Sequence, residues 1–118
     1  MPDARGRMAP TDVTTAFVCR TWWPKGAAHT ASVTITDRAQ VAALASRIDA
    51  GSIGLRPGAP APCSKRLRGS WYAVTLQGPD VRVEARADEI SCGTITNGAV
   101  SGTMTPGLAH ALDALFPA

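Results

Sequence analysis

Two stretches in the second half of the chain alternate between apolar and polar residues, and a turn sequence joins them. They cover residues 70–76 and 81–87, and residues 77–80 (Gln-Gly-Pro-Asp) have the composition of a tight turn. The apolar residues at every second position are Tyr72, Val74, Leu76, Val81, Val83, Ala85 and Ala87. Because side chains of a strand alternate between the two faces of a sheet, this pattern predicts a hairpin with one buried and one wet face. The rest of the chain must therefore cover one side of a sheet.

Further strands are predicted on both sides of this hairpin. Residues 13–23 are rich in β-branched and aromatic types, and residues 31–36 alternate with Val33 and Ile35 on one face. Residues 89–96 form a fifth strand candidate. Asn97-Gly98 then predicts a short turn, after which residues 99–104 return briefly.

Two segments have the period of a helix. Apolar residues spaced by three and four positions predict a helix that begins after Asp37 and ends at Gly51. A second helix, residues 106–116, begins with Thr105 as its cap and Pro106 in its first turn. The apolar faces of the two helices comprise Val41, Leu44, Ala45 and Ile48, and Leu108, Leu112, Leu115 and Phe116.

The order of these elements is β-β-α-loop-β-β-β-α, with residues 51–69 as the long loop. We therefore expect an α+β domain in which an antiparallel sheet of about five strands carries two helices on one face. Residues 1–10 are polar and rich in Pro and Gly, so they are expected to be a disordered tail, and residues 11–118 a single domain.

Composition excludes several classes of function. The net charge of +3 and the small number of aromatic residues argue against a nucleic-acid binder. No apolar run is long enough to span a bilayer, and no signal peptide is intact, which is compatible with a mature form cut from a secreted precursor. The cysteines and histidines lack metal-ligand spacing, so neither a metal site nor a cofactor is predicted.

The end of the long loop combines rigid and cationic residues. Pro60 and Pro62 precede a stretch that we call the basic segment, which consists of Cys63, Ser64, Lys65, Arg66, Leu67 and Arg68. Stiff flanks beside exposed cations suit presentation to a protein partner, because a rigid loop loses less entropy on binding. The alternative is a solvated cationic loop of the kind common on protein surfaces.

A cysteine just before the hairpin and another just after it resemble the pattern of the subtilisin-inhibitor-like family of actinomycete secreted proteins. The resemblance implies a disulfide between Cys63 and Cys92, a reactive bond after Lys65, and trypsin-like or subtilisin-like proteases as partners. The chain departs from the family in lacking a second cysteine pair around its helix. The motifs Val18-Cys19-Arg20, Pro62-Cys63 and Cys92-Gly93-Thr94 also resemble uncharacterised actinobacterial secreted or lipoprotein domains, which implies an extracytoplasmic location.

The third cysteine leaves alternatives open. Cys19 would pair with Cys92 if both lie on strands, or it would be a buried structural thiol. As a nucleophile it would need a nearby base in a pocket, for which His29 and His110 are the candidates. The adjacent acids Asp88 and Glu89 are expected to point to opposite faces of a strand and not to share an acid–base site.

Three tryptophans are candidate contact residues, with packing on the core as the alternative for each: Trp22, Trp23 and Trp71. The leading hypothesis is a small extracytoplasmic, non-enzymatic protein-binding domain, and its sharper form is a serine-protease inhibitor. The alternatives are an accessory protein of a secreted complex that binds through Trp22 and Trp23, and a small enzyme or cyclase with an unrecognised pocket. A homodimer is left open.

Overall fold

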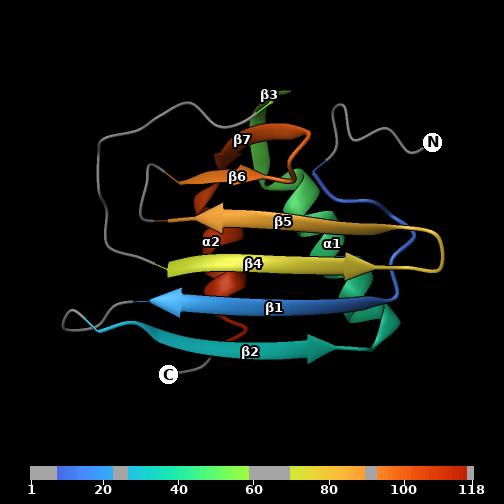
Figure 1. Ribbon diagram of the computed structural model, residues 1–118. Helices are drawn as coiled ribbons and strands as arrows, with labels where there is room; N and C mark the ends of the chain where they lie inside the picture. The colour runs from blue at the N-terminus through green and yellow to red at the C-terminus, as the bar shows by residue number, and fades with distance from the viewer. Residues whose placement is uncertain (1–7, 23–26, 59–69, 90–92, 117–118) are drawn as a thin grey trace.

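The computed structural model describes residues 8–22, 27–58, 70–89 and 93–116 (Figure 1). Within these ranges the chain forms seven strands and two helices. In chain order they are β1 (Thr15–Trp22), β2 (His29–Ile35), α1 (Arg38–Ala50), β3 (Ser52–Pro57), β4 (Ser70–Gln77), β5 (Arg82–Asp88), β6 (Thr94–Thr96), β7 (Val100–Met104) and α2 (Pro106–Asp113).

The strands form one antiparallel sheet in the order β2-β1-β4-β5-β6-β7-β3. Both helices lie behind the sheet in Figure 1 and cover the same face. The predicted hairpin is the β4–β5 pair, in which Tyr72 lies opposite Ala87 and Leu76 opposite Val83. The α+β class, the antiparallel sheet and the two helices agree with the sequence analysis.

The prediction of about five strands is wrong, since the described residues form seven. β3 lies inside the segment that was predicted to be a loop, and it pairs with β7 through Ser52 opposite Met104 and Pro57 opposite Val100. Its Gly54 and Pro57 are residues that weaken a strand signal, and the ladder shifts register between Ile53 and Arg56. β7 is a full strand of five residues where only a brief return was expected.

Both helix starts were predicted correctly. The Asp37 carboxylate accepts a hydrogen bond from the Gln40 backbone N–H at 3.0 Å, and the Thr105 hydroxyl accepts one from the Leu108 N–H at 3.3 Å. At the end of α1 the Gly51 N–H donates to the Arg47 carbonyl at 2.7 Å. These contacts satisfy backbone groups that a helix end leaves without an intrahelical partner.

The core lies between the helices and the covered sheet face. The buried side of α1 consists of the four residues that the sequence predicted, and α2 buries Leu108 and Leu112. Tyr72, Val74 and Leu76 supply the centre of the sheet side. The larger fully buried side chains are Tyr72, Met8, Ile48, Leu76, Ile95 and Leu112.

The first described residues are part of this core. Met8 is fully buried and Ala9 is 2% exposed, although both fall in the segment expected to be a disordered tail. The Asp49 carboxylate on α1 accepts hydrogen bonds from the Met8 N–H at 2.8 Å and the Ala9 N–H at 3.3 Å. The Asn97 side chain also donates to the Met8 carbonyl at 3.3 Å. The expectation therefore fails at Met8 and Ala9, because a single methionine gave no periodic signal; residues 1–7 lie outside the described part.

We expect Met8→Ala to lower the free energy of unfolding by about 2–5 kcal/mol, because truncation of a fully buried methionine loses apolar burial and leaves a cavity. Urea denaturation followed by circular dichroism measures the change. The matched control is Ile53→Ala, whose side chain is 52% exposed, and we expect it to stay within about 1 kcal/mol of the wild type. Equal stability of Met8→Ala and the wild type would contradict the burial of this segment.

Candidate functional site

The basic segment lies outside the described residues, and the nearest described residues are Gly58 before it and Ser70 after it. The described structure stops at Gly58, beyond β3, and resumes at Ser70, the first residue of β4. β5, β6 and β7 lie between these two strands in the sheet. With a strand spacing of about 4.8 Å, the two strands are separated by about 19 Å across the sheet.

Ser70 is held by three hydrogen bonds and is only 2% exposed. Its backbone N–H donates to the Glu89 carboxylate at 2.8 Å, and its carbonyl accepts from the Glu89 N–H at 3.0 Å. Its hydroxyl accepts from the Arg20 guanidinium at 2.8 Å. These contacts join β4 to β1 and β5 at the point where the chain returns from the basic segment.

Gly58 is held at the other end of that segment. Its N–H donates to the Ala99 carbonyl at 2.9 Å, and its carbonyl accepts a hydrogen bond from the Ser101 hydroxyl. Ser101 is almost fully buried. The backbone φ of 88° at Gly58 is in the left-handed region that glycine adopts without steric cost. The described residues that flank the basic segment, Gly58 and Ser70, are therefore both fixed to the sheet.

The Ser70 contacts belong to a larger polar group on the helix-covered side, which we call the anchor cluster: Arg20, Ser70, Tyr72, Glu89 and Asp113. The Tyr72 hydroxyl donates a hydrogen bond to the Asp113 carboxylate on α2. The Tyr72 ring also packs 6.1 Å from the ring of Phe116, measured between centroids. The cluster therefore ties the end of α2 to the same part of the sheet that holds Ser70.

The environment of the anchor cluster shifts two of its pKa values. Burial raises the pKa of the Glu89 carboxyl, and the charge and hydrogen bond of Asp113 add to this, whereas the Ser70 N–H and Arg20 act against it. Burial also raises the pKa of the Tyr72 hydroxyl, with the hydrogen bond to Asp113 as the next cause. Tyr72 is therefore a neutral hydrogen-bond donor at physiological pH.

The tryptophans do not form one surface. Trp22 lies opposite Ser70 on the helix-covered side. The Arg20 guanidinium carbon is 4.7 Å from the centroid of the Trp22 ring, and the centroid of the His29 ring is 5.6 Å from it. Trp71 lies on the other face of the sheet and is 45% exposed. Trp23 lies outside the described residues. Trp22 is thus engaged within the molecule, and Trp71 is available to a partner.

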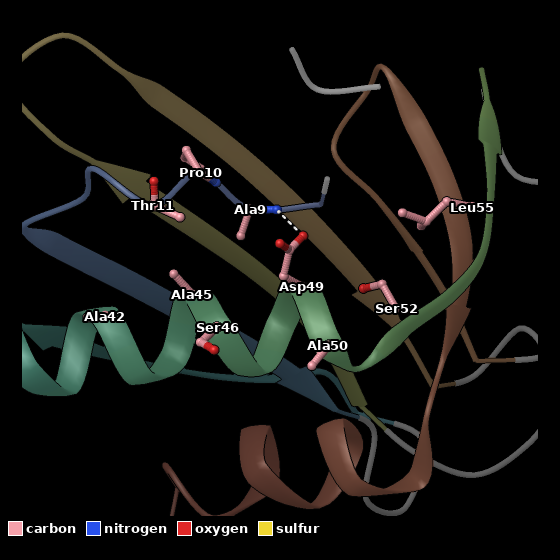
Figure 2. Close-up of a pocket in the computed structure, with 10 residues that line it drawn as sticks. All are labelled: Ala9, Pro10, Thr11, Ala42, Ala45, Ser46, Asp49, Ala50, Ser52 and Leu55. Atoms are coloured by element: carbon pink, nitrogen blue, oxygen red, sulfur yellow. Dashed lines mark hydrogen bonds between the residues drawn. The ribbon is translucent and has the colours of Figure 1, made fainter. Parts of the chain in front are cut away.

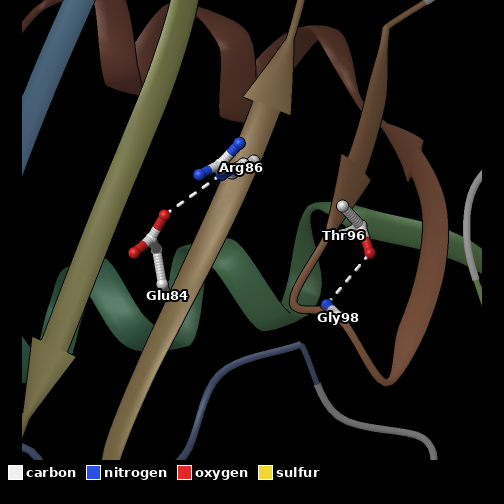
Figure 3. Close-up of polar contacts among 4 residues, drawn as sticks. All are labelled: Glu84, Arg86, Thr96 and Gly98. Atoms are coloured by element: carbon white, nitrogen blue, oxygen red, sulfur yellow. Dashed lines mark hydrogen bonds and ion pairs between the residues drawn. The ribbon is translucent and has the colours of Figure 1, made fainter.

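The sheet face without helices, which we call the open face, carries Trp71, the exposed Phe17 and a shallow cavity of about 320 Å³. The cavity is lined by residues of β1, β4, β5 and β6. Next to it, Arg86 contacts Glu84 at 3.1 Å, and the Gly98 N–H donates to the Thr96 hydroxyl at 3.1 Å (Figure 3). Both partners of the Arg86–Glu84 ion pair are well exposed, so the pair adds little stability.

A second cavity of about 540 Å³ lies between α1, the N-terminal segment and β3 (Figure 2). Alanines and small polar side chains line most of it. Its carboxylate, Asp49, points to the N-terminal segment in Figure 2 and accepts the two backbone hydrogen bonds described above. Among the described residues that line this cavity, the Asp49 carboxylate therefore holds the N-terminal segment against α1.

The residues considered for catalysis are not brought together. Cys19 is a free, half-buried thiol on the open face, so its expected burial is not observed, and its alternative partner Cys92 lies outside the described residues. His29 lies on the helix-covered side and His110 is exposed on α2. Asp88 and Glu89 do point to opposite faces, as the sequence predicted.

Other predictions can be compared only with the described residues. In the described ranges no three His, Cys, Asp or Glu side chains are grouped so as to hold a metal ion. Neither α1 nor α2, the helices in this part of the chain, has the length and apolar character needed to cross a membrane. The predicted Cys63–Cys92 disulfide lies outside the described residues.

The chain matches no protein-family model, no curated protein and no solved structure. The resemblance to subtilisin inhibitors therefore stays a prediction. The anchor cluster itself was not predicted, because its members lie between positions 20 and 113 and share no motif. The sequence predicted only that Asp88 and Glu89 point to opposite faces of the sheet.

We expect Glu89 to make the stability of the protein depend on pH. Its pKa is higher in the native state than the ordinary value of 4.5, so the native carboxyl binds its proton more tightly than the unfolded chain does. The resulting stabilisation is complete below pH 4.5 and is lost as the pH rises through the native pKa. We expect Glu89→Gln to remove this dependence, since the amide oxygen still accepts the Ser70 N–H.

Urea unfolding at several pH values between 4 and 8 measures this effect. Glu89→Gln should match the wild type at the acidic end and exceed its stability at neutral pH. The control is Glu84→Gln on the same strand, where the carboxylate is exposed, and its stability should follow the wild-type pH profile. An unchanged pH profile in Glu89→Gln would contradict the role of this carboxyl.

Proposed function

We propose that the chain is an extracytoplasmic, non-enzymatic protein-binding domain that presents the basic segment to a protein partner. The observation that carries this proposal is the fixing of both flanks by hydrogen bonds, at Gly58 to Ala99 and the buried Ser101, and at the buried Ser70 to Glu89. A loop anchored at Gly58 and Ser70 has fewer conformations to lose when it binds than a loop with free ends. Lys65, Arg66 and Arg68 supply the positive charge that an acidic surface or protease pocket would recognise.

The sharper form of the proposal is inhibition of a serine protease, with Lys65 as the primary specificity residue. The resemblance to the subtilisin-inhibitor-like family is its source, and a disulfide between Cys63 and Cys92 is part of it. The sheet is compatible with that disulfide, because Ser70 and Glu89 are direct neighbours on β4 and at the end of β5. Cys63 precedes Ser70 by seven residues and Cys92 follows Glu89 by three, so each cysteine is close in sequence to one member of this neighbouring pair.

Titration of trypsin-like and subtilisin-like proteases with the protein tests the sharper form. We expect stoichiometric inhibition, and Lys65→Ala should weaken inhibition of a trypsin-like enzyme by roughly 100-fold or more, as for other central anchor residues. The matched control is Arg82→Ala, which removes an exposed cation from β5 and should leave inhibition unchanged. A combined Cys63→Ser and Cys92→Ser variant should inhibit less than the wild type. Full protease activity at stoichiometric protein would reject inhibition.

The open face supports a second candidate, an accessory protein of a secreted complex. Trp71 and Phe17 are exposed there, and exposed aromatic residues are typical anchors of protein interfaces. The sequence predicts this function for Trp22 and Trp23, and Trp22 is half-buried and contacts Arg20 and His29. Trp71 therefore joins Trp22 as a residue on which this candidate depends.

We expect Trp71→Ala to abolish capture of a partner by the immobilised protein, because an exposed aromatic anchor contributes more than its neighbours. Surface plasmon resonance with the captured partner measures the loss. Ile53→Ala, which truncates the exposed isoleucine of β3, is the control and should bind normally. Normal binding by Trp71→Ala would exclude the open face as the interface.

A further inference from the structure

The two edges of the sheet differ in how well they are protected. β2 is one edge and β3 is the other. The edge of a sheet exposes unpaired backbone N–H and C=O groups, and natural proteins protect such edges with charges, prolines, bulges or short strands. β3 has three of these features: a register shift between Ile53 and Arg56, the charge of Arg56, and Pro57.

β2 has none of these features. It pairs with β1 over all seven residues, from His29 to Ile35, without a register shift. Its sequence, HTASVTI, contains no proline, no glycine and no Asp, Glu, Lys or Arg. A regular, uncharged edge of this length can accept another strand.

We propose that β2 pairs antiparallel with β2 of a second copy of the chain around a two-fold axis, so that the two sheets become continuous. The proposal does not depend on the basic segment or on protease inhibition. The two copies would contact through the same seven residues, which is the self-complementary arrangement that a two-fold dimer requires.

A second copy suits this edge because the strand is complementary to itself. With the axis at Ser32, Thr30 faces the partner's Thr34 and Ser32 faces the partner's Ser32, all on the open face. On the helix-covered side, Ala31 faces the partner's Val33. Paired hydroxyls and paired apolar side chains stabilise neighbouring strands, and no like charges are opposed.

The helix-covered side of β2 also has apolar surface that a second copy would cover. Val33 lies opposite the fully buried Val18, yet Val33 itself is only partly buried and packs at the margin of the core. Ala31 is likewise partly exposed. The partner's Ala31 and Val33 would extend the core across the axis. Since one pair of seven-residue strands buries less than a standard interface, we expect a dimer of modest affinity.

Sedimentation velocity over a hundred-fold concentration range, up to about 1 mM, tests the proposal with the full chain. The mass should rise from 12.2 kDa toward twice this value as the concentration increases. Ser32→Lys should abolish the rise, because it places two ammonium groups next to each other at the axis, while the exposed position tolerates the side chain. Ile53→Lys, on the β3 edge, is the matched control and should dimerise like the wild type.

A mixing experiment separates loss of pairing from loss of folding. Ser32→Lys and Ser32→Glu should each stay monomeric alone and form a mixed dimer when combined in equal amounts. A wild-type monomer at every concentration would overturn the proposal, and so would association that survives Ser32→Lys. Loss of association in Ile53→Lys but not in Ser32→Lys would assign the interface to β3 and equally contradict it.

Discussion

In the central strands β1, β4 and β5, alternate side chains point into the core between the sheet and the two helices, which lie on the same side. The register of these strands and the exposure of the opposite face depend on this one-sided burial. It fixes the register of β1, β4 and β5, because a shift by one residue would move Val18, Val74 and Ala85 from the core to water. It also leaves the opposite face without a covering layer. The exposed Trp71 and Phe17 lie on that face, and β2 is one edge of the same sheet.

At the end of the sheet where β1 and β5 finish and β4 begins, the covered side changes from apolar to polar. Arg20, Ser70 and Glu89 meet there, and Tyr72 connects them to Asp113 on α2. A half-buried carboxylate is costly unless hydrogen bonds and a positive charge stabilise it, and here the Ser70 N–H and Arg20 do so. The same contacts hold the chain where it returns from the basic segment, which connects the stability of the domain with the function that we propose.

Local patterns in the sequence predicted most elements but not the anchor cluster or the β3 edge of the sheet. The β4–β5 hairpin, the buried stripe of α1 and the caps at Asp37 and Thr105 were predicted correctly, because each depends on residues close together in the chain. β3 was missed because its pairing with β7 is long-range and its Gly54 and Pro57 are typical of loops. Met8 and the anchor cluster depend on contacts between positions far apart, for which a single sequence has no signal.

The central claim is that the chain on both sides of the basic segment is fixed to the sheet. Amide hydrogen exchange measured by NMR tests it directly at Gly58, Ser70 and Glu89, whose N–H groups donate to Ala99, the Glu89 carboxylate and Ser70. The account predicts that these three amides exchange within about tenfold of the rate of Val74 in the centre of β4. Exchange of Gly58 and Ser70 at the rate of an unprotected amide would contradict it.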